Sequence, residues 1–192
     1  MAKAARGGAG PAVPVSRIRW CYTVAMAARV QVPVEEYLQT SFEGPDPEYV
    51  DGEIVERAVP DFLHGTLQGR FIEIFYEVRK RHSLYAVTEV RHKLRDSGYR
   101  IPDVAVHAGV RPAERFPSTP PYIAIEILSP DDRFSEVVQK LDEYRTWGVP
   151  HIWLADPRLR RLLVYGPTGL GEVTEFHLPD YNVVITPQEV FG

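Results

Sequence analysis

Apolar residues recur along the chain with two different periods, and each period predicts a different kind of element. A stripe at spacings of three and four predicts an amphipathic helix within residues 60–81, formed by Leu63, Leu67, Phe71, Phe75 and Val78. The same spacing predicts a second helix ending near Gly148, with the stripe Phe134, Val137, Val138, Leu141 and Tyr144. Pro33 followed by two glutamates predicts a short helix in PVEEYLQ.

Short β-prone runs predict strands before, between and after the two long helices. EYVDGEIVER predicts a hairpin that turns at Asp51 and Gly52, and residues 84–107 predict two strands around a turn at 96–98. The runs YIAIEIL, HIWLAD and RLLVYG predict three more strands, followed by a shorter β tail that ends at Phe191. Because these elements show no internal repeat or linker, we predict a single α/β domain over residues 29–192.

The beginning of the chain has a different composition from the rest. Residues 1–28 are rich in Ala, Gly, Pro and basic residues, and the first 30 residues hold five cations and no acid. They contain no apolar run long enough for a signal sequence or a membrane span. We therefore predict a disordered basic arm over residues 1–28 and no membrane partner, with either Met1 or Met26 as the start of translation.

Composition and charge narrow the class of protein. The chain of 192 residues is 44% hydrophobic and 25% charged, as in ordinary globular proteins. Its single cysteine, Cys21, excludes an internal disulfide framework and a cysteine metal site, which predicts a reducing, cytoplasmic location. The net charge of -4 argues against a protein that coats nucleic acid non-specifically.

One segment is basic in spite of the acidic total. Residues 79–100 hold seven cations against two acids, Glu89 and Asp96. Such a patch, which lies just before Asp103 in the sequence, could contact the phosphates of a DNA backbone without reading its bases. The alternative is a polar helix end followed by a solvated strand face, since charged runs are usually solvated.

Two acids occupy places where strand patterns call for apolar side chains. Asp103 lies in RIPDVAVH and Glu126 lies in IAIEIL. A buried carboxylate is costly unless it is paired, so the simplest interpretation is one salt bridge for each acid. The alternative is that both acids converge on a hard divalent cation, which prefers oxygen ligands. Such an ion can activate a bound water and stabilise charge on a phosphoryl oxygen.

These acids and their surroundings resemble a known group of nucleases. Pro102 and Asp103, followed by Glu126 on the next strand, are similar to the acidic core of the PD-(D/E)XK nuclease superfamily. The ordered phrases EYVDGEIVER, RIPDVAV, IEILSPDD and GVPHIWLADP resemble more closely the Uma-type family of "putative restriction endonucleases", over residues 33–191. The resemblance implies a restriction-endonuclease-like mixed β-sheet flanked by helices. It also implies an endonuclease that uses Mg²⁺ or Mn²⁺ to hydrolyse double-stranded DNA.

The resemblance assigns roles to four residues. Asp103 and Glu126 would bind the metal ion, and the main-chain carbonyl of Ile127 would be a third ligand. The superfamily's lysine stands two residues after the glutamate, where this chain has Leu128. Lys140, on the following helix, would supply the cation instead and orient the attacking water. The alternative for Lys140 is an exposed helix lysine.

Three further residues have weaker support. Glu53 matches a glutamate of the family phrase and would join the site, or it is an exposed hairpin residue. His64, near the start of a helix, resembles the family's histidine, although a single histidine more often caps or packs. Strand alternation predicts that Glu89 shares one face with Arg91 and Lys93, either as a charge ladder or as support for the site.

Two other classes of function compete with the nuclease. Leu128 in place of the lysine leaves open a catalytically inactive nuclease-fold protein that binds DNA or another partner. A small-molecule hydrolase is disfavoured because the chain has no Gly-rich phosphate loop and no nucleophile elbow. A homodimer is compatible with cutting both strands of a duplex, since each strand then meets one site.

Overall fold

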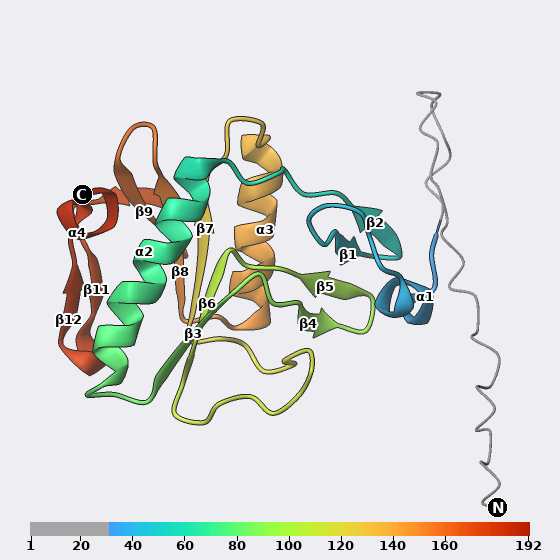
Figure 1. Cartoon of the computed structure of the whole chain (residues 1–192), viewed down its shortest axis with the longest axis horizontal. Helices are drawn as coiled ribbons and strands as arrows, with labels where there is room; N and C mark the ends of the chain where they lie inside the picture. The colour runs from blue at the N-terminus through green and yellow to red at the C-terminus, as the bar shows by residue number, and fades with distance from the viewer. Residues whose placement is uncertain (1–30) are drawn as a thin grey trace, which may run out of the picture. The chain divides into compact units, whose positions relative to one another are not determined.

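A six-stranded sheet forms the centre of residues 31–192, the part of the chain that the computed structural model describes (Figure 1). The order of its strands is β10 (Gly169–Val173), β9 (Arg161–Gly166), β8 (His151–Asp156), β7 (Ile123–Ile127), β6 (Val104–Ala108) and β3 (Leu84–Thr88). Strands β7 and β8 are parallel, and the other neighbours are antiparallel. The predicted mixed sheet is thus confirmed, whereas the arm predicted for residues 1–28 lies outside the described residues.

Two helices cover opposite faces of this sheet (Figure 1). Helix α2 (Phe62–Arg79) buries Leu67, Phe71, Phe75 and Val78 in the larger core. Helix α3 (Phe134–Trp147) buries Leu141 and Tyr144 on the other face, and ends at Gly148 with a left-handed backbone, φ 99°. Residues of a strand point alternately to its two faces, so Ile123, Ile125 and Ile127 face α2 while Ala124 and Glu126 face α3.

A second, four-stranded antiparallel sheet lies next to α1 (Val34–Gln39), in the order β2 (Glu53–Val55), β1 (Glu48–Val50), β5 (Gly98–Arg100) and β4 (His92–Arg95). Hairpin β1–β2 turns at Asp51 and Gly52, whose positive φ values of 50° and 90° match the backbone of a tight hairpin turn. Tyr37, Tyr49 and Tyr99 pack together between α1 and this sheet. The opposite face of β1 carries Glu48 toward the larger sheet and α3.

Residues 84–107 form four strands rather than the two predicted. Glu89, which follows the last residue of β3, has a left-handed backbone, φ 55°. This conformation ends the strand and changes the direction of the chain. Strand β3 therefore pairs with β6 in the six-stranded sheet, while β4 pairs with β5 in the other. The alternation that placed Glu89 on one strand face with Arg91 and Lys93 is wrong for this reason.

The C-terminal tail is also more varied than a β tail. Strands β11 (Phe176–Leu178) and β12 (Val183–Ile185) form a ribbon joined by the short 3-10 helix η1 (Pro179–Tyr181). Helix α4 (Pro187–Phe191) follows, and its start is a capping box between Thr186 and Glu189. Across residues 31–192, no helix is both long and apolar enough to cross a membrane.

Candidate active site

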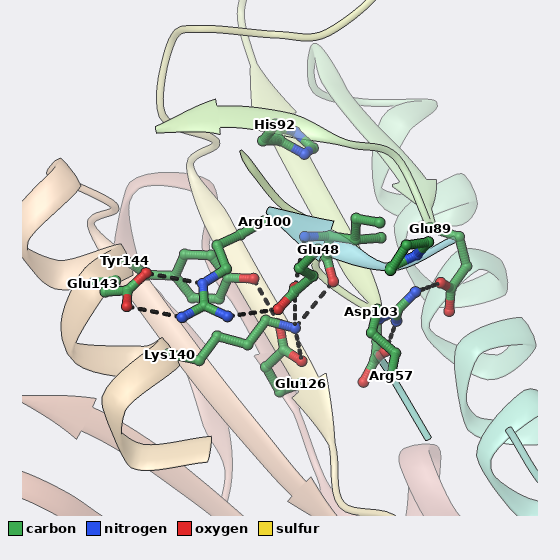
Figure 2. A network of polar contacts seen from close by, with 12 residues as sticks. Glu48, Arg57, Glu89, His92, Arg100, Asp103, Glu126, Lys140, Glu143 and Tyr144 are labelled. Carbon is green, nitrogen blue, oxygen red and sulfur yellow. Dashed lines mark hydrogen bonds and ion pairs between the residues drawn. The ribbon is translucent and has the colours of Figure 1, made fainter. Parts of the chain in front are cut away.

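Glu126, in the middle of β7, has both carboxylate oxygens hydrogen-bonded (Figure 2). Oε2 accepts from Nζ of Lys140 at 2.8 Å, and Oε1 accepts from the hydroxyl of Tyr144 at 2.8 Å. Lys140 and Tyr144 are four residues apart on α3, so they present their side chains on one face of that helix. The strand tolerates a buried acid because the helix packed over it supplies two donors.

Lys140 lies between two buried carboxylates rather than in solvent. Its Nζ is 2.8 Å from Glu126 Oε2 and 2.9 Å from Glu48 Oε1, and it donates to the carbonyl of Ile101 at 3.0 Å. Burial lowers the pKa of Lys140, but Glu126 and Glu48 outweigh that effect, and the pKa lies above its ordinary value. The side chain is therefore an ammonium, and its contacts account for its three hydrogens.

Glu48 is held by a second cation, Arg100, which ties it to α3. Glu48 Oε2 accepts from Arg100 at 2.7 Å, and Glu48 Oε1 accepts from the backbone N–H of Ile101 at 2.8 Å. The same guanidinium makes two parallel bonds of 2.8 Å to the carboxylate of Glu143. A bidentate pair of this kind fixes geometry as well as charge, so Arg100 positions Glu48 against Lys140.

Asp103 immediately precedes β6 and is bonded directly to β7. Its Oδ2 accepts from the backbone N–H of Ile127 at 2.8 Å, next to Glu126 in the sequence. Its Oδ1 accepts from Arg57 at 2.9 Å, and Arg57 also donates to Glu89. Burial raises the pKa of Asp103, but the neighbouring His64, Lys140 and Arg57 outweigh it and lower that pKa. Asp103 is thus an ionised carboxylate in the interior.

His64 and Glu89 approach Asp103 from two other elements. The backbone N–H of His64 donates to the N-cap residue Asp61 at 2.8 Å, which fixes the histidine in the first turn of α2. Within residues 31–192 the buried Nε2 of His64 has no hydrogen-bond partner, and it lies 3.4 Å from Asp103 Oδ1. Glu89 accepts from Gln68 at 2.5 Å, and its left-handed backbone directs the carboxylate to this side.

The donor set is suited to a divalent cation. One ligand atom from each of His64, Glu89 and Asp103 lies within 4.8 Å of the others. A buried imidazole nitrogen that makes no hydrogen bond within residues 31–192 and lies beside two carboxylates is a natural ligand group for such an ion. Glu126 is not one of these three residues, but it is joined to Asp103 through the N–H of the adjacent Ile127.

The whole network carries an excess of negative charge (Figure 2). Within residues 31–192, five carboxylates face three buried cations and the more exposed Arg95, which lies 3.9 Å from Glu143: the acids are Glu48, Glu89, Asp103, Glu126 and Glu143, and the buried cations are Arg57, Arg100 and Lys140. Burial raises the pKa of Glu126 to about 8, and Lys140 only partly opposes that shift. Because burial opposes the ionised form of Glu126 and Lys140 compensates it only in part, a further cation beside this carboxylate would be stabilised.

Comparison with known proteins identifies the family to which this chain belongs. The family model described as "Uma2: Putative restriction endonuclease" matches residues 34–192. The chain belongs to the Uma2 family. No curated protein matches it.

The fold is also shared with a solved structure. A crystal structure of "a putative nuclease belonging to DUF820" from Anabaena variabilis has a TM-score of 0.72 to this chain at 22% sequence identity. The match covers 83% of this chain and 97% of that one. At this identity the likeness shows the fold, and the expected restriction-endonuclease-like architecture is confirmed.

For this Uma2-family chain, the structure gathers four of the predicted site residues: Asp103, Glu126, Lys140 and His64. Ile127 contacts Asp103 through its N–H, and the role of its carbonyl stays a prediction. Glu53 lies on β2 in register with Val50, on the face of the hairpin that also carries Glu48, and its role stays a prediction as well. Leu128 packs against the apolar cluster under α3.

Sequence reasoning missed three charged residues of the site. Glu48 and Arg57 flank Glu53 within the family phrase, so the phrase itself was the available signal. Arg100 was counted in the basic segment, but only 7% of it is exposed and it pairs with two acids. No sequence pattern indicates which of these charges face inward, because β1 and β5 meet α3 only in the folded chain.

The basic segment 79–100 does not form a continuous surface beside Asp103. Five of its cations contact acids, in the pairs Lys80–Glu77, Arg91–Asp46, Lys93–Asp96, Arg95–Asp51 and Arg100–Glu48. Arg79 and Arg81 lie at the C-terminal end of α2, whereas His64 is in its first turn, roughly 22 Å away at the rise of an α-helix. The helix end is polar, as the alternative interpretation expects, but the strand part is not simply solvated, because Arg91 and Arg100 are buried.

Proposed function

We propose that this Uma2-family protein is a metal-dependent endonuclease that hydrolyses phosphodiester bonds of double-stranded DNA. The observation that supports it best is the juxtaposition of Asp103 and Glu126. The two acids are linked through the N–H of Ile127, and Lys140 reaches Glu126 from α3. An acid just before β6, an acid on the neighbouring β7 and a lysine at the second acid resemble the acidic core of the PD-(D/E)XK nucleases, with the lysine supplied from the helix instead of position 128.

Asp103 and Glu126 would hold a Mg²⁺ or Mn²⁺ ion, with the carbonyl of Ile127 as a further oxygen ligand. His64 and Glu89 are the side chains near Asp103 that could complete the set. Oxygen-rich ligands suit these hard cations. When bound, such an ion lowers the pKa of a coordinated water and stabilises negative charge on a phosphoryl oxygen.

Lys140 would orient the attacking water or stabilise charge at the phosphate. Its ammonium is fixed by Glu126 and Glu48, so it is already placed beside the reacting centre. Because its three hydrogens are engaged with protein acceptors, it must exchange one contact to donate to water or phosphate. The carbonyl of Ile101, at 3.0 Å, is the weakest of these acceptors because it carries no formal charge.

Plasmid cleavage tests the proposal. Purified protein should nick or linearise supercoiled plasmid with Mg²⁺ or Mn²⁺, and lose this activity in chelator and in Asp103→Asn. Asp142→Asn is the matched control, because Asp142 is a half-exposed acid of α3 that pairs with Arg145. Equal cleavage by wild type and Asp103→Asn across both metals would refute the assignment.

A catalytically inactive, nuclease-fold DNA-binding or interaction protein is the second candidate. The position of Arg57 favours it, since a protein cation already contacts both Asp103 and Glu89. That function predicts duplex binding that is indifferent to chelator and to Asp103→Asn. A homodimer with one site for each strand, and a cytoplasmic location, belong to the endonuclease proposal as further expectations.

A further inference from the structure

A pocket of about 480 Å³ shares Glu89 with the candidate active site. The loop after α1, the Glu89–Arg91 segment and the 115–116 segment line it, with Phe42, Asp46, Arg91, Arg115 and Phe116 among its residues. Its volume falls in the range of small-ligand sites, roughly 300–1,000 Å³. Glu89 therefore belongs to two features: its carboxylate is one of the metal-ligand group with His64 and Asp103, and its residue forms part of the pocket wall.

Arg91 is a buried charged residue of the pocket lining. Only 7% of Arg91 is exposed, and within residues 31–192 its Nε has no hydrogen-bond partner. The guanidinium stacks 4.6 Å from the ring centroid of Tyr37, and its Nη2 lies 3.0 Å from Asp46. Protein atoms cover this Nε, so a ligand in the pocket would meet Arg91 through the small part of its side chain that stays exposed.

Aromatic and guanidinium planes surround this donor. The rings of Phe42 and Phe116 both have their centroids 5.9 Å from the Arg91 guanidinium, and Arg115 lies 4.8 Å from the centroid of Phe116. Proteins hold unpaired nucleobases between aromatic rings and arginine planes of this kind. The lining thus suits a flat, heteroaromatic ring.

The charges of the residues that line the pocket favour an uncharged base over a free phosphate as its ligand. Asp46 and Glu89 balance Arg91 and Arg115, so the charged residues of the lining sum to zero. A multiply charged anion gains little in such a pocket, because Arg91 is already paired with Asp46 and the charges of the lining cancel. An uncharged ring with both acceptors and donors on its edge matches the lining better.

We propose that this pocket binds one unpaired nucleobase of the substrate, beside the phosphate that is cleaved. The inference rests on the proposed nuclease function, and it adds a substrate class: DNA with a flipped, bulged or single-stranded nucleotide at the site. Glu89 connects the pocket to Asp103 through Arg57. The left-handed backbone of Glu89 redirects the chain between the pocket and Asp103. Strained residues of this kind cluster at functional sites.

A binding experiment without cleavage tests the pocket. The probe is a 20-base-pair duplex with a single bulged 2-aminopurine nucleotide, compared in chelator with the same duplex carrying an abasic bulge. Wild-type protein should bind the 2-aminopurine duplex about tenfold more tightly, the magnitude expected for stacking of one base, and should change the fluorescence of that base. Phe116→Leu and Arg115→Gln should each reduce this preference several-fold and leave binding of the abasic duplex unchanged.

The controls separate this inference from the proposed function. Phe134→Leu changes an exposed aromatic residue of α3 and should keep the preference. Arg91→Met removes the ion pair with Asp46 and risks misfolding, so the conclusion rests on the half-buried Phe116 and the exposed Arg115. If wild-type protein binds the two duplexes with equal affinity, or binds neither, the proposal that the pocket holds a base is refuted. Plasmid cleavage without a preference for the base would refute only the base-binding role of the pocket. A preference for the base without any cleavage would refute only the proposed nuclease function.

Discussion

Lys140 donates to Glu126 at 2.8 Å across the boundary between α3 and β7, fourteen residues apart in the sequence. The helix therefore places a cation at Glu126, as the proposed function requires of a chain with Leu128 at the position of the motif lysine. Because α3 packs on the face of β7 to which Glu126 points, the register of one helix against one strand determines whether the site contains a lysine. The proposed activity and the stability of the core therefore both depend on the contact between Lys140 and Glu126.

Lys140→Met should remove activity and also destabilise the fold. It leaves Glu126 and Glu48 buried without their shared cation, a change that typically costs about 3–5 kcal/mol. Urea denaturation followed by circular dichroism measures the loss. The double variant Lys140→Met with Glu126→Gln should recover about half of the stability while remaining inactive on plasmid. Recovery of cleavage in the double variant would contradict a catalytic role for Lys140.

Arg57→Met should tighten divalent metal binding. Arg57 contacts two carboxylates, Asp103 and Glu89, that belong to the candidate ligand group, so it competes with an ion for the same charges. Its removal should increase the affinity for Mn²⁺ about tenfold or more, since a neighbouring positive charge is lost at short range. Isothermal titration calorimetry measures the change, with Arg70→Met, from an exposed pair with Glu73, as control. Unchanged or weaker Mn²⁺ binding by Arg57→Met would place the ion elsewhere.

The two glutamates of the hairpin should differ in their effect on stability. Glu48 is 3% exposed and bonds Lys140, Arg100 and the N–H of Ile101, so Glu48→Gln should cost about 2–4 kcal/mol. Glu53 is only partly buried, and Glu53→Gln should change stability by less than about 1 kcal/mol. Thermal unfolding measures both. Plasmid cleavage by Glu53→Gln then tests its predicted role separately, because loss of activity in a stable variant would keep Glu53 in the site.

The main elements were predictable because each follows from a local pattern. The stripe from Leu67 to Val78 specifies α2, and the Asp51–Gly52 turn specifies the β1–β2 hairpin. The break at Glu89 was not predictable, since a glutamate rarely adopts a left-handed backbone and nothing nearby in the sequence indicates it. The start of α4 could have been found, because Thr186 and Glu189 have the spacing of a capping box.

The site was predictable where it depends on strand acids and unpredictable where it depends on tertiary pairing. Asp103 and Glu126 attract attention because acids are unusual in runs of apolar strand residues. Arg57 and Arg100 have no such signal, since exposed arginines are common and only the fold shows that these two are buried against acids. Sequence patterns thus locate the acids, whereas their partners are fixed by how β1, β5 and α3 meet.

The stacked pair His92 and His107 should make the protein less stable in mild acid. Their rings are 5.2 Å apart, and the two Nε2 atoms are 3.1 Å apart. Nδ1 of His92 bonds the carbonyl of Val90 at 2.8 Å and must donate, so Nε2 of His92 accepts and Nε2 of His107 donates. This arrangement needs a neutral His92, because a protonated His92 has no ring nitrogen left to accept.

Burial lowers the pKa of His92 to about 4 and also lowers the pKa of His107, while the unfolded chain keeps the ordinary value of about 6.5. The unfolded state therefore binds more protons as pH falls from about 6.5 toward 4, and the free energy of unfolding should decrease over that window. Denaturation of wild type and His107→Gln at pH 7.5 and pH 5 measures the effect. His107→Gln should lose part of the decrease, whereas His177→Gln, at an exposed position, should retain it. The same pH dependence in all three proteins would show that the pair is not responsible.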